Sequence, residues 1–148
     1  MKSSLSKGKI DNMRLLLFVF MLSLLFTACE KKELEQEFSA HYTGTFMRVQ
    51  EPQSPLENPI TSNVTLHFTE KTFSGTSSVA KYPAICSGNF TISQSKINVE
   101  NTCFFTADFD WTFIFQGEYS YELNGDDLKI WRDYSNGFRD VYQLKKNR

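Results

Sequence analysis

The chain has 148 residues, with 16 Lys and Arg against 17 Asp and Glu, and 15% of the residues are aromatic. This length fits one domain of ordinary size, and the balanced charge gives no sign of the clustered basic face that nucleic-acid binding needs. The 14 Phe beside only 7 Gly indicate a filled β core and exclude a disordered polymer.

The first residues carry the pattern of an export signal. Four basic side chains precede an apolar stretch at residues 15–26, which Thr27 and Ala28 separate from Cys29. A positive region, a short apolar core and a small residue before the cut are typical of a secretory signal. The stretch is shorter than the ~20 apolar residues of an ordinary membrane span. Met13, directly before this stretch, is an alternative start to Met1.

The end of this signal contains a modification motif. Phe26-Thr27-Ala28-Cys29 resembles the lipobox of bacterial lipoproteins, which implies that Cys29 takes a diacylglycerol and becomes the new N-terminus. We therefore predict a signal peptide at 1–28 and a protein anchored to the bacterial cell envelope, in the outer membrane, by lipid on Cys29. The alternative is an ordinary secretory signal cleaved nearby, with Cys29 as a free thiol or half of a disulfide.

Residues 29–40 are predicted as a charged tether, and 41–148 as the folded domain. In the tether, Lys31, Lys32, Glu33 and Glu35 loosely resemble the surface-export signal of some Bacteroidetes-type lipoproteins, although a solvated spacer explains them as well. Without its leader, the chain carries 12 basic and 16 acidic residues, a net charge of −4.

Period-2 alternation predicts strands through the first half of the domain. The first strand is predicted at 44–49. The second contains Val64, Leu66 and Phe68, and a tight turn at Glu70-Lys71 leads to the third at 73–79. Residues 50–60 hold three of the four prolines and are predicted as a loop, because proline removes a ladder donor.

A hairpin around Gln94-Ser95 is predicted from a single register. It pairs Ile92 with Ile97 and Phe90 with Val99, and the same register brings the last two cysteines, Cys86 and Cys103, opposite each other. Non-hydrogen-bonded pairs of this kind bring Cα atoms to ~4.5 Å, within the disulfide range. We predict a Cys86–Cys103 disulfide, with two buried free thiols as the alternative.

The second half begins with an irregular connection at 104–110. A long strand is then predicted at 111–123, bent at Gly117, or equally two strands that meet there. Asn124-Gly125 is the strongest hairpin signal in the chain and leads into a strand at 128–132. A three-residue loop at 135–137 pairs the final strands, with Arg132 opposite Asp140, Ile130 opposite Tyr142 and Leu128 opposite Leu144.

Eight or nine antiparallel strands joined by short hairpins indicate an all-β fold, an up-and-down barrel or a sandwich. Gly44-Thr45-Phe46 resembles the Gly-x-Trp motif of lipocalins, with Phe in place of Trp, and residues 64–75, 87–93, 119–130 and 142–145 are similar to strands of bacterial lipocalin-like lipoproteins. The resemblance implies a barrel of about eight strands that holds one small ligand at its open end.

Catalysis finds little support in the sequence. The two histidines, His41 and His67, lack metal-ligand spacing, and His67 has the parity of a surface residue. Asp108 and Asp110 are only two acids without a glycine-rich ligand loop, so we predict a solvated loop there. We predict no enzyme activity, no cofactor and no metal.

Two binding functions remain. The first is a small apolar ligand inside the barrel; the candidate lining residues are Phe46, Phe68, Phe90, Trp111, Phe113, Phe115, Tyr119 and Tyr121. The alternative is that the same rings fill a small barrel that has no cavity. The second function is a monomeric envelope interaction or inhibitor protein that binds a protein partner through loops 50–60 and 104–110, with Phe104, Phe105 and Phe109 exposed.

Overall fold

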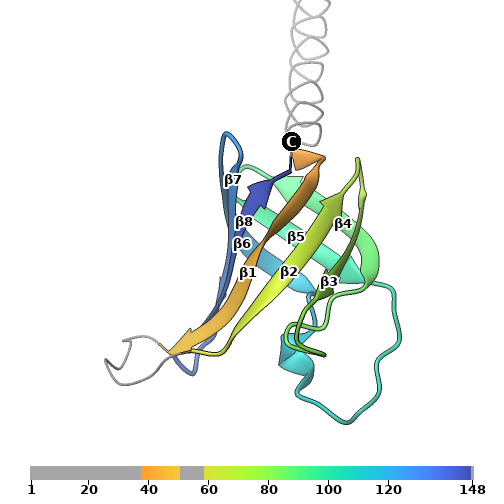
Figure 1. The fold of residues 1–148 in the computed structure, drawn as a ribbon, viewed down its shortest axis with the longest axis vertical. Coiled ribbons are helices and arrows are strands. Elements are labelled where there is room, and N and C mark those ends of the chain that lie inside the picture. The colour runs from red at the N-terminus through yellow and green to blue at the C-terminus, as the bar shows by residue number, and fades with distance from the viewer. Residues whose placement is uncertain (1–37, 51–58, 148) are drawn as a thin grey trace, which may run out of the picture. The chain divides into compact units, whose positions relative to one another are not determined.

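The computed structural model describes residues 38–50 and 59–147, which form a closed barrel of antiparallel strands in chain order (Figure 1). The eight strands are β1 (His41–Gln50), β2 (Thr61–Phe68), β3 (Thr72–Ser77), β4 (Ser87–Ser93), β5 (Lys96–Asn101), β6 (Gly117–Asn124), β7 (Asp127–Asp133) and β8 (Phe138–Lys146). β1 pairs with both β2 and β8, which closes the sheet. The predicted all-β, up-and-down barrel is confirmed. The predicted signal peptide, Cys29, the tether up to residue 37 and most of the proline loop lie outside the described residues.

The predicted hairpin registers are confirmed. In β4 and β5, Ile92 pairs with Ile97 and Phe90 with Val99. The pairs of the β7–β8 hairpin, 128 with 144, 130 with 142 and 132 with 140, are those that a three-residue loop predicts. Gly137 in that loop has φ +83°, the left-handed conformation that favours glycine. These turns fix which side chains face the interior, because a slip of one residue would reverse every strand face.

Large apolar side chains fill the interior. The core cluster consists of Phe38, Tyr42, Phe46, Val64, Leu66, Phe68, Phe73, Phe90, Ile92, Ile97, Val99, Phe115, Tyr119, Leu128, Ile130, Tyr142 and Leu144. Its rings contact one another in a series, with centroid distances of 4.7 Å for Phe38–Phe68, 6.5 Å for Phe68–Phe73, 5.4 Å for Phe73–Phe115, 5.1 Å for Phe115–Tyr142 and 4.8 Å for Tyr142–Phe46. Such edge-to-face and tilted contacts add to the hydrophobic stabilisation of the core.

The predicted long strand at 111–123 is wrong before Gly117. Trp111–Phe113 form a 3₁₀ turn, η1, and β6 begins at Gly117, where φ is +88°. The turn forms because the Asp110 carboxylate accepts a hydrogen bond from the Thr112 backbone N–H at 2.9 Å, which caps it. The strand parity is lost, so Trp111, predicted to line the interior, is 53% exposed, whereas Ile114 is buried.

The predicted disulfide between Cys86 and Cys103 is present. Its Cα atoms are 6.3 Å apart, wider than the ~4.5 Å of a regular non-hydrogen-bonded pair. The ladder between β4 and β5 ends at Gly88 and Asn101, so both cysteines lie just beyond it. The bridge therefore links the segment before β4 to the long connection after β5.

The barrel has two different ends (Figure 1). The turn end carries the tight turns of the β2–β3, β4–β5 and β6–β7 hairpins and the C-terminus of β8. Phe38 enters the core here and contacts Phe68, Phe90 and Tyr121. Phe38, which lies in the predicted tether at 29–40, is buried. The loop end carries segments 59–60, 78–86, 102–116 and 134–137.

Candidate functional site

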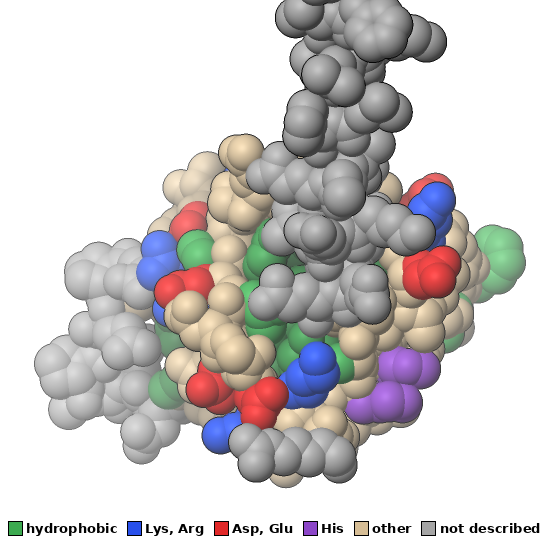
Figure 2. Space-filling model, turned by 90° about the horizontal axis from the view of Figure 1, so that it is seen from above, with side chains coloured by type: hydrophobic (Ala, Val, Ile, Leu, Met, Phe, Trp, Pro, Cys, Tyr) green, Lys and Arg blue, Asp and Glu red, His purple; other side chains and the backbone are tan. Residues whose placement is uncertain are grey.

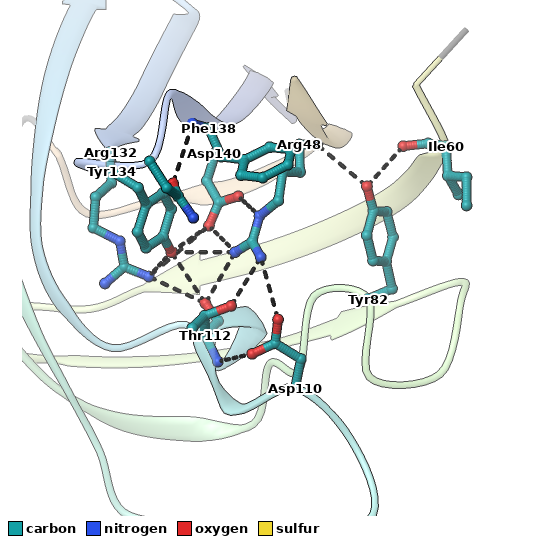
Figure 3. Close-up of polar contacts among 10 residues, drawn as sticks. Arg48, Ile60, Tyr82, Asp110, Thr112, Arg132, Tyr134, Phe138 and Asp140 are labelled. Atoms are coloured by element: carbon teal, nitrogen blue, oxygen red, sulfur yellow. Dashed lines mark hydrogen bonds and ion pairs between the residues drawn. The ribbon is translucent and has the colours of Figure 1, made fainter. Parts of the chain in front are cut away.

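A buried carboxylate organises the loop end. Asp140 on β8 is 1% exposed and lies opposite Arg48 on β1 and opposite Arg132 on β7 (Figure 3). Arg48 donates from Nε to Asp140 Oδ1 at 2.6 Å and from Nη2 to Oδ2 at 2.9 Å. Such bidentate pairs are among the strongest hydrogen-bonded contacts in proteins. The pair joins the two strands that close the barrel.

Arg48 also holds the η1 turn against the barrel. Its Nη1 donates to Thr112 Oγ1 at 2.8 Å, and its guanidinium lies 3.8 Å from the ring centroid of Phe113. Asp110, which caps the turn, is 3.7 Å from Nη1. A guanidinium over an aromatic face is attracted by the ring quadrupole. The strand β1 and the 102–116 segment are therefore connected through one side chain.

Arg132 and Tyr134 complete the network from β7. The Tyr134 hydroxyl donates to Asp140 Oδ2 at 2.8 Å and accepts a hydrogen bond from Arg132 Nη2. Arg132 Nη1 donates to the Gln116 carbonyl at 2.7 Å, which fixes the chain just before β6. The Arg132 guanidinium also lies 4.5 Å from the ring centroid of Tyr119. Two cations thus share one buried carboxylate and hold the backbone of the neighbouring loop.

The tyrosines of this network retain their protons. Burial, together with the hydrogen bond to Asp140, raises the pKa of Tyr134 to about 12. Burial also raises the pKa of Tyr119 and that of Tyr142 above the usual value, because ionisation would place an unsolvated charge in the core. These phenols therefore stay protonated at neutral pH. The protonated Tyr134 hydroxyl can therefore keep donating its hydrogen bond to Asp140.

The exposed large apolar side chains of the described residues gather at this same end. They are Ile60, Val79, Phe104, Trp111 and Phe138. Phe104 is fully exposed, and Trp111 projects from η1, which Arg48 holds in place. Phe105 and Phe109, predicted to be exposed with Phe104, are partly buried and contact each other at 5.9 Å. These exposed side chains therefore lie on separate segments of the loop end, which is where an interaction site could form.

An ion pair connects two loops at this end. Lys81 donates to Asp108 Oδ1, 2.5 Å away, and its ammonium lies 5.1 Å from the Phe109 ring centroid. Hydrogen bonds from Lys81 and Thr106 lower the pKa of Asp108 to about 2. Lys81 itself has φ +60°. The contact connects segment 78–86 to segment 102–116. Asp108 and Asp110 are exposed, as the predicted solvated loop requires, and each also forms an ion pair, with Lys81 and Arg48 respectively.

The predicted ligand-lining residues have three different surroundings. Phe46, Phe68, Phe90, Phe115 and Tyr119 are buried in the core, whereas Phe113 and Tyr121 are partly buried beside it. Trp111 does not line the interior, because it belongs to η1 and is exposed. Their predicted role as ligand contacts stays a prediction. The grooves found on the described residues, such as one of about 420 Å³ lined by Lys129 and Gln143, lie on the outer wall.

Sequence reasoning missed the polar network except for one pair. The Arg132–Asp140 pairing followed from the hairpin register. Arg48 was missed because it contacts Asp140 across the pairing of β1 with β8, which connects residues 92 positions apart in the sequence. Tyr134 and Thr112 were likewise not singled out. One signal in the sequence could have indicated the network. Asp140 has the inward parity of its predicted strand, and a buried polar group needs a hydrogen-bond partner.

No family model, curated protein or solved structure matches this chain. Among the described residues, no helix is long and apolar enough to cross a membrane. Within the same residues, no three or more His, Cys, Asp or Glu side chains converge as they would around a metal ion.

Proposed function

We propose that this protein is a lipid-anchored protein of the bacterial cell envelope that binds a protein partner through the loop end of its barrel, without catalysing a reaction. One observation carries the proposal: the exposed large apolar side chains of the described residues, Ile60, Val79, Phe104, Trp111 and Phe138, all lie at that end. Exposed aromatic residues contribute strongly to protein–protein binding.

The surroundings of Trp111 support this role. Thr112 and Phe113, which follow it, are held by Arg48 through a 2.8 Å hydrogen bond and a 3.8 Å ring contact. A side chain whose backbone is already fixed loses little entropy on binding. The loop end therefore presents a preorganised aromatic side chain to a partner.

The proposed anchor is compatible with this use of the barrel. The predicted lipid site, Cys29, precedes the described residues, and the chain enters the barrel at Phe38, at the turn end. Two or more acyl chains on Cys29 would give the stable membrane binding that a single chain does not.

The packed interior favours the partner over a small apolar ligand held inside the barrel. The core rings contact one another from Phe38 at the turn end to Phe46, whose ring is 6.4 Å from that of Phe113 at the loop end. A ligand pocket usually measures ~300 Å³ or more, so a ligand held inside the barrel would have to lie among these rings. The ligand proposal is retained as the competing outcome of the experiment.

The experiment places a photo-crosslinking amino acid at position 111 or 104 of the full chain in its own cells. The matched control places it at position 98, an exposed residue of β5 on the barrel wall. We expect a discrete protein adduct from the loop-end positions that is absent from position 98. The same adduct, formed from position 104, should be lost when Trp111→Ser is introduced.

Two results would overturn the proposal. One is adducts of equal yield from positions 98, 104 and 111, which indicates non-specific proximity. The other is native mass spectrometry of the purified protein that shows a retained apolar small molecule and no loop-end adduct, which favours a ligand inside the barrel.

A further inference from the structure

The sequence spacing of His41 and His67 predicted no metal site, but the strand pairing places the two side chains opposite each other. We propose that His41 and His67 form a two-histidine site for a late first-row divalent metal ion, with Cu²⁺ bound most tightly. This site lies on the outer wall near the turn end, away from the proposed partner surface. His41 is on β1 and His67 is directly opposite on β2. The two side chains, the only described histidines, lie against each other in Figure 2.

The strand register brings these two imidazoles as close as an antiparallel sheet allows. The Phe68 backbone N–H donates to the Ala40 carbonyl at 2.9 Å, so residues 40 and 68 form a hydrogen-bonded pair. The next pair, His41 with His67, is therefore a non-hydrogen-bonded one, in which side chains lie closest. The ring centroids are 3.5 Å apart and the ring planes differ by 7°.

Both imidazoles are available for coordination. His41 is exposed and His67 is half-buried. Within the described residues, each ring stacks on the other and neither ring forms a hydrogen bond or an ion pair. Together with Asn147 and Ser74 they line a groove of about 570 Å³, which has room for the waters that complete a coordination shell.

The coordination step involves no redox change. Rotation of the exposed His41 ring about its χ2 bond directs one nitrogen lone pair toward the metal held by His67, at the ~2.0 to 2.1 Å typical of Zn–N bonds. Two imidazole nitrogens replace two waters of the hydrated ion, which leave as water. Imidazole suits Cu²⁺, Ni²⁺ and Zn²⁺, and the general affinity order makes Cu²⁺ the tightest of these.

The test titrates CuCl₂, in a non-chelating buffer, into the untagged full chain in detergent micelles, followed by calorimetry and electron paramagnetic resonance. We expect one Cu²⁺ per chain with two equivalent nitrogen ligands. Because two linked ligands bind far more tightly than one, His41→Ala or His67→Ala alone should weaken binding about 100-fold. Thr65→Ala, an exposed change two residues away on the same face of β2, is the control and should leave the affinity unchanged.

Binding to the folded state should also raise the melting temperature of the wild-type protein and of Thr65→Ala, but not that of the histidine variants. Circular dichroism checks that each variant is folded. The proposal is overturned if both histidine variants bind Cu²⁺ as the wild type does, or if the resonance spectrum shows a single nitrogen ligand, which means that the rings only stack.

Discussion

Replacing Asp140 with Ala tests whether the polar network stabilises the barrel. Asp140 is 1% exposed and pairs with Arg48, whose side chain is only 13% exposed, at 2.6 Å. The change leaves that guanidinium, and the neighbouring Arg132, without their buried counter-charge. Removing one partner of a buried ion pair costs about 3–5 kcal/mol. A domain of this size is stable by only about 5–15 kcal/mol, so the loss is a large fraction of the total.

The assay is equilibrium unfolding in guanidinium chloride, followed by circular dichroism, which gives the free energy of unfolding. The matched control is Asp133→Ala, since Asp133 is 57% exposed and pairs with Arg139, whose side chain is 36% exposed. Exposed pairs of this kind contribute about 0.2–1 kcal/mol, so the control should lose no more than that. A loss of less than about 1 kcal/mol for Asp140→Ala would mean that water solvates the guanidiniums, and the reasoning from burial would then be refuted.

Four further outcomes are expected. Gly44→Val should prevent a stable barrel, measured by circular dichroism, because a Cβ at Gly44 would lie 1.9 Å from the Gln143 carbonyl oxygen across the β1–β8 closure; a native spectrum contradicts this. Ultraviolet titration should show Tyr134 ionising near pH 12, to which its pKa is raised in the folded state. The stability gained from its protonated form should be complete below the unfolded pKa of 10 and lost as the pH rises through the folded pKa of about 12. Ionisation of every tyrosine near pH 10 contradicts this prediction. Reduction of the 86–103 disulfide should lower the free energy of unfolding by at most ~3 kcal/mol, and an unchanged denaturation midpoint counts against the bridge. Cys29→Ser should move the protein from the membrane fraction to the soluble envelope fraction, and retention in the membrane contradicts the predicted lipid anchor.

The sequence predicted those parts of the fold that depend on local pairing. Each confirmed hairpin has a short turn, as at Gln94-Ser95 and around Gly137, and alternating apolar residues that fix one register. The two cysteines reinforced the same register, so the disulfide could be predicted as well. Local chemistry and burial favoured the same arrangement at these sites, and the prediction was therefore reliable.

The error at residues 111–116 occurred because a polar side chain competed with the strand pattern. Residues 111–116 alternate like a strand, but the Asp110 carboxylate caps the Thr112 N–H at 2.9 Å and starts a 3₁₀ turn instead. Arg48 then stabilises this turn from a strand more than sixty residues earlier. Phe38 was assigned to the tether because the segment before it is charged, yet it is buried against Phe68. Periodicity does not detect either long-range contact.

The polar network and the exposed aromatic side chains have separable roles. Asp140 is buried and makes no part of the exposed surface, whereas Trp111 is 53% exposed and contributes only its backbone carbonyl to the hydrogen bonds of η1. Asp140→Ala should lower stability and, because Asp140 holds the Arg48 side chain that bonds to Thr112, should also disturb the backbone that presents Trp111. Trp111→Ser should abolish partner binding with little change in stability, because surface substitutions usually change it by no more than ~0.5 kcal/mol. If instead Trp111→Ser destabilised the barrel as much as Asp140→Ala, the exposed tryptophan would be a structural residue, and the loop end would lose the strongest reason for regarding it as a binding surface.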